Sequence, residues 1–204
     1  YQGDSFQELA PPESLSTSPT AINEHGDVIG SMKLADNLSR EYVYHDGAFA
    51  ELNVPAGHNY VRACAINDSG TIAGGYAETY DEYVQLSLWD TTGQRRDLNL
   101  RGNVYDLNNH GQVVGEMQDG GQRVAFIYDA EHDTLTRLCS GLFAQAHSIN
   151  DRGQAVGFRA GPTTDGRPVK AYLWEDGTTL DLHTCTWPSD VLEGYYIAIA
   201  NKIT

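Results

Sequence analysis

The sequence predicts an all-β fold, a five-bladed β-propeller made of repeats of about 42 residues. Three observations lead to this prediction. A short element with an asparagine and two glycines occurs four times, and a second element with an aromatic residue and a closing leucine alternates with it. No stretch shows the 3.6-residue apolar spacing of an amphipathic helix, so helices are not expected.

The first repeated element predicts a tight hairpin turn between two strands. Its copies are INEHGDVIG, INDSGTIAG, LNNHGQVVG and INDRGQAVG, whose asparagines are Asn23, Asn67, Asn108 and Asn150. One glycine follows each asparagine after three residues, and a second follows after seven. Because Asn and Gly both tolerate the positive φ that such turns require, we expect these residues to shape turns and not to bind ligands.

The second repeated element predicts another hairpin. Its copies are VYHDGAFAEL, LWDTTGQRRDL, IYDAEHDTLTRL and LWEDGTTLDL, with the aromatic residues Tyr44, Trp89, Tyr128 and Trp174. The N-terminal YQGDSFQEL is a fifth copy, with Tyr1 and Leu9 in the same roles. Aromatic residues at one repeat position favour packing between sheets over a sugar-binding platform. Two hairpins per repeat give four short strands, the content of one propeller blade.

The two ends of the chain predict how the ring closes. The chain starts at the third strand of a repeat, and its last ten residues, YYIAIANKIT, resemble a first strand leading to another turn asparagine, Asn201. We expect residues 1–204 to form one propeller domain, in which the N- and C-terminal strands pair and leave no open sheet edge. No second-strand copy follows Asn201, so either the fifth blade has three strands or the domain is excised from a longer secreted protein.

The repeated pattern resembles the bacterial HAF-type family of extracellular repeat proteins. The residues that carry the resemblance are Ala21-Ile22-Asn23 with Gly26 and Gly30, the matching residues around Asn67 and Asn150, and Leu173-Trp174-Glu175-Asp176-Gly177 through Asp181-Leu182. The copy at Asn108 departs from it, with Asp106-Leu107 in place of Ala-Ile. The resemblance implies secretion and a propeller-like fold, but no particular activity, because the shared residues are structural.

The charge of the chain argues against some classes of partner. Its net charge is −15 and its pI is near 4.6, so its surface repels phosphate backbones and anionic lipids. No apolar run approaches the roughly 18 residues of a membrane span. We expect an extracellular or periplasmic monomer that carries no cofactor and no metal ion, and whose partner is a protein or a glycan and not a nucleic acid.

The three cysteines lack the CxxC spacing of metal and redox motifs. Cys139 and Cys185 each follow a repeated leucine, so they can lie on neighbouring blades, and we treat them as a disulfide candidate. Cys64 stands between alanines in a strand, where we expect it to act as a small buried apolar residue.

The long links between hairpins are the expected place of a binding site, because binding residues usually lie on loops held by a rigid scaffold. The residue five positions before each turn asparagine should lie at the mouth of the channel on that side. These residues are Ser18, Arg62, Asn103, Gln145 and Tyr196. They are polar and differ between repeats, which fits either a polar ligand at the axis or a channel filled with ordered water. Tyr80 and Trp187, on long links, are further candidates because exposed aromatic residues anchor partners.

The function that we expect is a non-catalytic, secreted binding module that recognises a macromolecule through its long-link face. The first alternative is a lectin-like, carbohydrate-binding propeller. The second is a glycan hydrolase or lyase that uses the carboxylates of YAETYDEY, which are Glu78, Asp81 and Glu82. No HExxH, GxSxG or P-loop pattern occurs, so the enzyme alternative is the weaker one.

Overall fold

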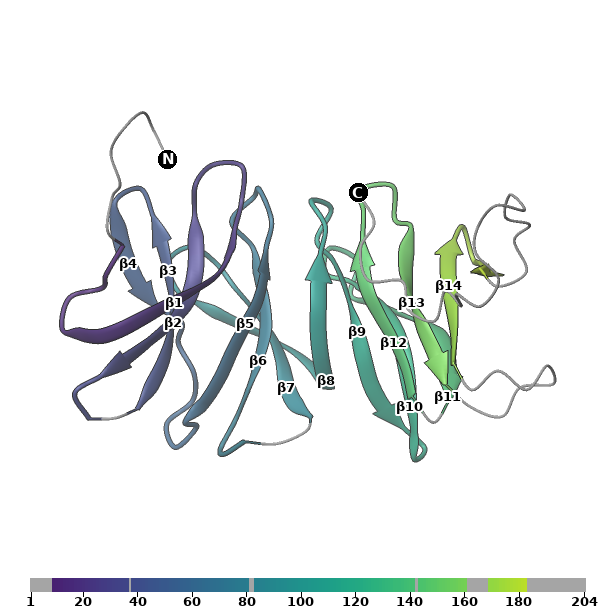
Figure 1. Ribbon diagram of the computed structural model, residues 1–204, viewed down its shortest axis with the longest axis horizontal. Helices are drawn as coiled ribbons and strands as arrows, with labels where there is room; N and C mark the ends of the chain where they lie inside the picture. Colours follow the sequence, from purple (N-terminus) through teal and green to yellow (C-terminus); the bar gives the residue numbers. More distant parts are fainter. Residues whose placement is uncertain (1–8, 37, 81–82, 142, 161–168, 183–204) are drawn as a thin grey trace, which may run out of the picture. The chain divides into compact units, whose positions relative to one another are not determined.

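The computed structural model describes residues 9–36, 38–80, 83–141, 143–160 and 169–182, which form β-strands joined by turns and links (Figure 1). The all-β prediction is therefore confirmed. The chain forms two compact units. The first unit comprises Tyr1–Asp81 and Ser87–Asp97, and the second comprises Glu82–Leu86 and Leu98–Thr204. None of the described residues forms a helix long and apolar enough to cross a membrane.

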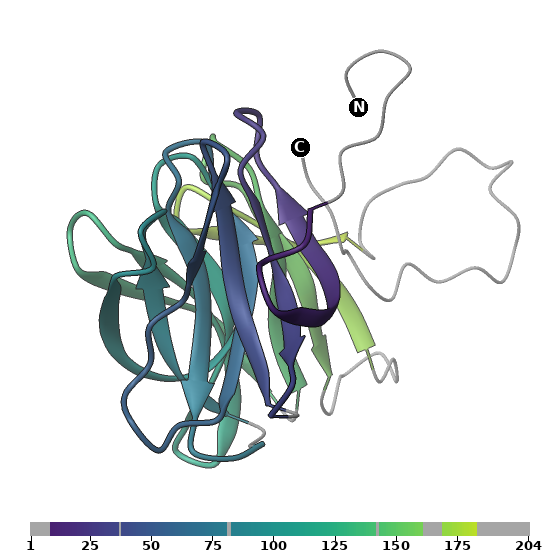
Figure 2. The same cartoon turned by 90° about the vertical axis from the view of Figure 1, so that its left-hand side faces the viewer.

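The first unit contains a four-stranded antiparallel sheet in the order β1-β2-β3-β4, drawn in purple and blue in Figures 1 and 2. Its strands are β1 (Ser14–Ile22), β2 (Val28–Leu34), β3 (Ser39–His45) and β4 (Ala48–Glu51). An antiparallel hairpin of β5 (Tyr60–Ile66) and β6 (Ile72–Ala77) follows it. The predicted long link PPESLSTSPT is mostly strand, because β1 already begins at Ser14.

The second unit contains two runs of four antiparallel strands, β8-β9-β10-β11 and β12-β13-β14-β15. The strands β7 (Val84–Trp89) and β8 (Arg95–Leu107) each run from one unit into the other. The remaining strands are β9 (Gln112–Asp119), β10 (Gln122–Asp129), β11 (Thr134–Gly141), β12 (Phe143–Ile149), β13 (Ala155–Ala160), β14 (Val169–Glu175) and β15 (Thr178–Asp181).

The first repeated element forms the predicted turn in all four copies. In the copy at Asn67, the Gly70 amide donates to the Asn67 carbonyl at 3.0 Å, and the Asn67 amide donates to the Thr71 carbonyl at 3.0 Å. The first glycine of each copy has a positive φ, between 72° and 88°, a conformation that side chains disfavour. The same bonds recur around Asn23, Asn108 and Asn150, so the glycine part of the turn prediction is confirmed.

The asparagines shape the turns as predicted, but they do so through their side chains, because none of them has a positive φ. The side-chain oxygen of Asn108 accepts hydrogen bonds from the amides of His110 and Gln112, as expected for an Asx turn. Its Nδ2 donates to the carbonyl of Asn150, one repeat further on, at 3.0 Å. In the first unit, Asn23 Nδ2 donates to the Asn67 carbonyl at the same distance. Each of these side chains therefore ties its own turn to the next one.

A β-bulge interrupts the first strand of every described repeat, three residues before the asparagine. The extra residues at the four register shifts are Thr20, Cys64, Tyr105 and His147. The second glycine of each copy lies beside the bulge. A Cβ on Gly115 would collide with the Asn103 carbonyl oxygen, and one on Gly74 would collide with that of Arg62. The second glycine therefore permits a close approach of two backbones.

Each unit has its own apolar core. The buried cluster of the first unit consists of Ile29, Val43, Leu52, Ala63, Ile66, Ile72, Tyr76 and Trp89. Trp89 is 2% exposed, and its indole nitrogen donates to the Asn53 carbonyl at 2.8 Å. In the second unit Tyr128 is buried, and Trp174 packs against a cluster of small and branched side chains. The predicted packing role is therefore confirmed for Trp89, Tyr128 and Trp174.

The predicted closure of the ring involves residues 1–8 and 183–204, which lie outside the described residues. The strand of YYIAIANKIT, the turn at Asn201 and the role of Tyr1 belong to these ranges. The single domain, the five-blade count and the pairing of the terminal strands therefore stay predictions.

Candidate functional site

Two β-bulges in the second unit bring Tyr105 and His147 face to face. Tyr105 is the extra residue where β8 pairs with β9, and His147 is the extra residue where β12 pairs with β13. A bulge redirects a side chain that would otherwise follow the strand's alternation. The two rings stack with centroids 4.8 Å apart and planes at 12°, and Phe158 lies 5.4 Å from His147 at 24°. The bulges therefore build a three-ring stack.

A directional chain of hydrogen bonds runs beside this stack to a carboxylate. His147 Nε2 donates to Gln145 Oε1 at 2.9 Å, and Gln145 Nε2 donates to the Tyr105 hydroxyl at 2.9 Å. That hydroxyl donates to Glu116 Oε1 at 2.9 Å, and Asn103 Nδ2 donates to the same oxygen at 3.2 Å. These hydrogen bonds bring together Asn103 and Gln145, two of the residues that the sequence predicted as ligand-binding.

Glu116 is a buried carboxylate with one incompletely paired oxygen. The residue is 2% exposed, and Oε2 has no hydrogen-bond partner among the described residues. Arg123 Nη1 lies 3.7 Å from Oε2, close enough for an ion pair but not for a hydrogen bond. A buried acceptor without a donor costs about 1–3 kcal/mol. Glu116 Oε2 is therefore a buried acceptor that receives no hydrogen bond from the described residues.

His147 contributes a second acceptor. Burial lowers the pKa of its imidazole, against a smaller opposite effect of the Glu116 charge. The ring is therefore neutral at pH 7, and the bond to Gln145 assigns its proton to Nε2. Nδ1 then carries a free lone pair, and it has no hydrogen-bond partner in the described part of the chain.

Arg123 lies at the border of this cluster between two aromatic rings. Its guanidinium carbon is 4.4 Å from the ring centroid of Phe143 and 5.9 Å from that of Tyr83. Such cation–π contacts favour a guanidinium stacked on a ring. Phe143 is itself 47% exposed. The stacking holds a set of N–H donors beside the acceptors of Glu116.

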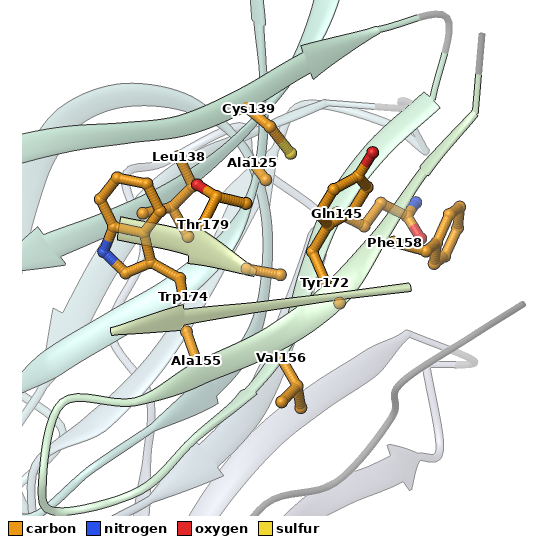
Figure 3. Close-up of a pocket in the computed structure, with 12 residues that line it drawn as sticks. Ala125, Leu138, Cys139, Gln145, Ala155, Val156, Phe158, Tyr172, Trp174 and Thr179 are labelled. Atoms are coloured by element: carbon orange, nitrogen blue, oxygen red, sulfur yellow. The ribbon is translucent and has the colours of Figure 1, made fainter. Parts of the chain in front are cut away.

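A hollow lined mainly by apolar side chains adjoins the hydrogen-bonded chain at Gln145. Its walls come from β10 to β15 of the second unit. Figure 3 shows Gln145 and Phe158 at one end of the hollow, and Trp174 with Thr179 at the other. With a volume of about 20 Å³, the hollow is far smaller than the roughly 300–1,000 Å³ of a typical ligand pocket.

The first unit has a buried glutamate with a different environment. Burial raises the pKa of Glu41 to about 7, and a hydrogen bond from the Ala63 backbone and the charge of Arg62 oppose the shift only in part. Its Oε2 also has no hydrogen-bond partner among the described residues. Burial raises the pKa of Cys64, the bulged residue of β5, to about 11. This thiol is therefore protonated at neutral pH and does not suit a nucleophile.

Tyr80 is the most exposed large side chain that follows a strand of the first unit. Its side chain is 81% exposed, and its ring meets the edge of Tyr60 with centroids 5.3 Å apart and planes at 81°. Edge-to-face contact is the arrangement that aromatic pairs prefer. The pair therefore presents an aromatic surface where β5 begins and after β6 ends.

The other predicted site residues divide into described and undescribed ones. Ser18 in β1 and Arg62 in β5 are exposed, and no bond joins them in the described part of the first unit. Trp187, Tyr196 and Cys185 lie outside the described residues, as do Asp81 and Glu82 of the acidic link. The disulfide between Cys139 and Cys185 therefore stays a prediction. Among the described residues, no group of three or more His, Cys, Asp or Glu side chains could hold a metal ion.

Sequence reasoning did not find Tyr105, Glu116 and Arg123. Tyr105 occupies the same repeat position as Cys64 and His147, so a comparison of the residues three before each asparagine would have shown a ring pair in the second unit. Glu116 becomes visible only through strand register, because it lies opposite Asn103 in the β8–β9 ladder. Arg123 carries no repeat signal that we can identify.

Comparison with solved structures supports a propeller-like fold. The chain is similar to the acylaminoacyl peptidase of Pyrococcus horikoshii (16% identity, TM-score 0.55), the propeller domain of the Trilobed protease of Pyrococcus furiosus (15%, 0.53) and TolB of Acinetobacter baumannii (15%, 0.56). The alignments cover 81%, 83% and 81% of this chain, but only 27%, 57% and 42% of those chains. At such identities the likeness concerns the fold alone.

Comparison of the sequence with curated proteins gives no match. A family model does match the chain, over residues 13–144, and its description is "Protein of unknown function (DUF3466)". The matched residues run from just before β1 into β12. They include three of the five members of the hydrogen-bonded network, Asn103, Tyr105 and Glu116, whereas Gln145 and His147 lie beyond the match. Since the match covers well over half of the sequence, the chain belongs to this family.

Proposed function

We propose that the chain is a non-catalytic binding module that recognises a macromolecular partner through the strand ends opposite the asparagine turns. The observation that carries this proposal is Tyr80, a large aromatic side chain that is 81% exposed and oriented by Tyr60. Tyrosine offers a large contact area and loses little conformational entropy when it binds. An exposed aromatic residue on an ordered support is therefore a suitable anchor for a partner.

The second unit has a comparable surface of its own. Arg123 and Phe143 lie near the beginnings of β10 and β12, with Tyr83 before β7. Tyr and Arg are the side chains most often found at the energetic centres of protein interfaces. The thiol of Cys64 is protonated at neutral pH and offers no activated nucleophile, which favours binding over thiol catalysis.

The finer features of the fold belong to the same proposal. Five copies of the aromatic element and a turn asparagine at 201 support five blades, closed by pairing of the terminal strands. The resemblance to the HAF-type repeats supports an extracellular or periplasmic location. A closed ring would hold the link ends of all blades on one side and give the partner a single face.

The proposal is tested by presenting immobilised protein to two unbiased probe sets, a random peptide display library and a glycan array. We expect saturable ligands from at least one set, and we expect Tyr80→Ala to weaken their binding at least tenfold. The matched control is Ile22→Ala, because Ile22 is also exposed, at 67%, but directly precedes the Asn23 turn. This control should bind as the wild type does.

Two results would contradict the proposal. One is that neither probe set gives a saturable ligand. The other is that the Tyr80 and Ile22 variants bind every ligand equally well, since the anchor would then lie elsewhere. Circular dichroism of both variants shows whether the fold is retained and separates loss of the surface from loss of structure.

A further inference from the structure

We propose that the strand β11 of the second unit binds an extended peptide with a basic residue at one end, which pairs with β11 as an additional strand. Such strand addition is a common way for proteins to recognise peptides. The proposal goes beyond the function proposed above, because it concerns a sheet edge of the second unit, whereas Tyr80 belongs to the first unit.

The strand β11 has one unpaired edge among the described strands. It pairs with β10 in an antiparallel register on one side, and no described strand pairs with it on the other side. In an antiparallel pair, about half of the residues of an outer strand direct their N–H and C=O groups away from the partner. These groups are a template for a further strand.

The length and exposure of β11 distinguish it from the outer strands of two other repeats. It has eight residues, whereas β4 and β15 have four each. None of its residues is buried, and four of them are exposed. Edge strands are usually protected by proline, lysine, a bulge or short length. A single bulge at Leu138 protects β11, which contains neither proline nor lysine.

A hollow beside the second half of β11 provides room for side chains of an added strand. Its volume is about 490 Å³, within the roughly 300–1,000 Å³ of typical ligand sites. The residues that line it are Arg137, Leu138, Cys139 and Ser140 of β11, with Asp119, Gly120, Gln122 and Val124 of the β9–β10 hairpin. Val124 and Leu138 make one part apolar, whereas Gln122 and Ser140 are polar and exposed. A side chain with a methyl group and a hydroxyl, such as threonine, matches both parts.

The hollow is open to solvent. Arg137 Nε lies 2.8 Å from Asp119 Oδ2, and the two side chains are 58% and 48% exposed. The pair neutralises most of the charge at this end of β11, so this end favours neither a basic nor an acidic side chain of the peptide.

The charge at the other end of β11 favours a basic residue. The turn before the strand contains Asp129, Glu131 and Asp133, and His132 pairs with Asp129 at 3.1 Å. The turn therefore keeps a net negative charge, to which the protein's total of −15 adds. A lysine or arginine of the peptide is attracted there, and a glutamate is repelled.

The test uses a synthetic heptapeptide of alternating threonine and valine that ends in two lysines. In antiparallel pairing, its C-terminal lysines lie beside the acidic turn. We expect the peptide to bind the whole chain saturably and to slow the hydrogen exchange of β11 amides, measured by NMR. The same amides should exchange quickly in the free protein, since their edge is unpaired.

N-methylated peptides show whether main-chain pairing holds the peptide. The N–H groups of an extended chain alternate between its two edges. Methylation of the odd residues removes the donors of one edge, and methylation of the even residues removes those of the other. We expect one of the two peptides to bind at least tenfold more weakly and the other to bind as before. Contact through side chains alone would not follow this alternation.

Two pairs of variants locate the site. Ser140→Trp fills the hollow and should weaken binding at least tenfold, whereas Leu180→Trp changes a 46% exposed residue of β15 and should leave binding unchanged. Glu131→Gln removes one charge beside β11 and should weaken binding about threefold. Asp46→Asn removes one charge from the turn between β3 and β4, where the side chain is 91% exposed, and should have no such effect.

Several results would overturn the proposal: no saturation, equal binding of both methylated peptides, equal binding of a peptide that ends in two glutamates, or equal binding by the Ser140 and Leu180 variants. Protection of all β11 amides in the free protein would also overturn it, because the edge would then be covered by the chain itself or by a second copy. The peptide comparisons need no variant, so they decide the question even if a variant does not fold.

Failure of this proposal differs from failure of the proposed function. Tyr80→Ala should bind the heptapeptide as the wild type does. If ligands that depend on Tyr80 are found while β11 stays unoccupied, the binding module stands and the β11 edge is not a binding site.

Discussion

The two units share one backbone plan but fill it with different side chains. Both have the asparagine turn, the glycine pressed against a carbonyl, the bulge in the first strand and a buried glutamate. In the first unit the bulges carry Thr20 and Cys64, whereas in the second they carry Tyr105 and His147. The backbone geometry is therefore the same in every described repeat, whereas the type of side chain at the bulge differs.

The buried glutamates show what this difference does. Glu116 receives two hydrogen bonds on Oε1 and faces Arg123, so part of the cost of burying its charge is offset. Glu41 has weaker compensation, and burial raises the pKa of its carboxyl to about 7. One plan thus gives an organised polar cluster in one unit and a titrating acid in the other.

The close approach of two backbones at the bulge can be disrupted in each unit by a separate variant. Gly74→Ala and Gly115→Ala each place a Cβ against a backbone carbonyl, so we expect each to lower the free energy of unfolding by about 3 kcal/mol. Gly120→Ala is the control. Its φ of 58° costs roughly 1 kcal/mol, but no heavy atom lies within 4 Å of the new Cβ. Chemical denaturation measures all three, and equal losses would contradict the close-approach explanation.

The buried carboxyl of Glu41 predicts a stability that depends on pH. Because the pKa of Glu41 is higher in the folded protein than in the unfolded chain, its contribution to stability is complete below about pH 4.5 and is lost as the pH rises to about 7. Glu41→Gln should therefore raise the free energy of unfolding at pH 8 by up to roughly 3 kcal/mol and change it little at pH 4.5. Urea denaturation at both values checks this.

The matched comparison for the buried glutamates is Glu116→Gln, whose carboxylate already has two donors and an ion pair. It should not stabilise the protein at pH 8. If both variants are stabilised equally, the two sites do not differ in the way that we describe.

The asparagine ties should be worth more where they are more deeply buried. Asn108 is 3% exposed and the bond from its Nδ2 to Asn150 is buried, whereas Asn23 is only half-buried. We expect Asn108→Ala to cost about 2 kcal/mol and Asn23→Ala about 1 kcal/mol. Thermal and urea denaturation give the ranking, and a larger loss for Asn23→Ala would reverse our view of the two turns.

The smallest expected effect concerns the bulged residues themselves. Tyr105→Phe removes the hydroxyl that joins Gln145 to Glu116 and should cost about 1 kcal/mol. Cys64→Ala removes a protonated thiol and should cost less. NMR of His147 adds a second readout. Loss of the hydrogen bonds that link His147, Gln145 and Tyr105 should change the tautomer balance of the His147 ring in the Tyr105 variant only.

Much of the fold follows from the repeat. The spacing of Asn23, Asn67, Asn108 and Asn150 predicted the turns, and the recurrence of Trp89 and Tyr128 predicted their burial. The asparagine backbone was predicted wrongly, because residue type alone does not distinguish a positive φ from an Asx turn. Side-chain oxygens that accept two backbone N–H groups satisfy the turn without the left-handed conformation.

The candidate site could be predicted only in part. Counting back from each asparagine located Asn103 and Gln145, because offset along a strand is a sequence property. The bulge cannot be located from the sequence in this way, because it depends on how β8 and β12 pair with their neighbours. Glu116 and Arg123 lie on β9 and β10, and only strand register places Glu116 opposite Asn103.

The ties between successive turns have a consequence for how such a chain can change. The same amide-to-carbonyl bond joins asparagines that are 44 residues apart in the first unit and 42 apart in the second. These bonds fix the positions of successive turns, whereas the strand ends opposite the turns can absorb insertions and deletions. Diversity introduced for new recognition is best placed after β2, β6 and β13, where added residues leave every tie intact.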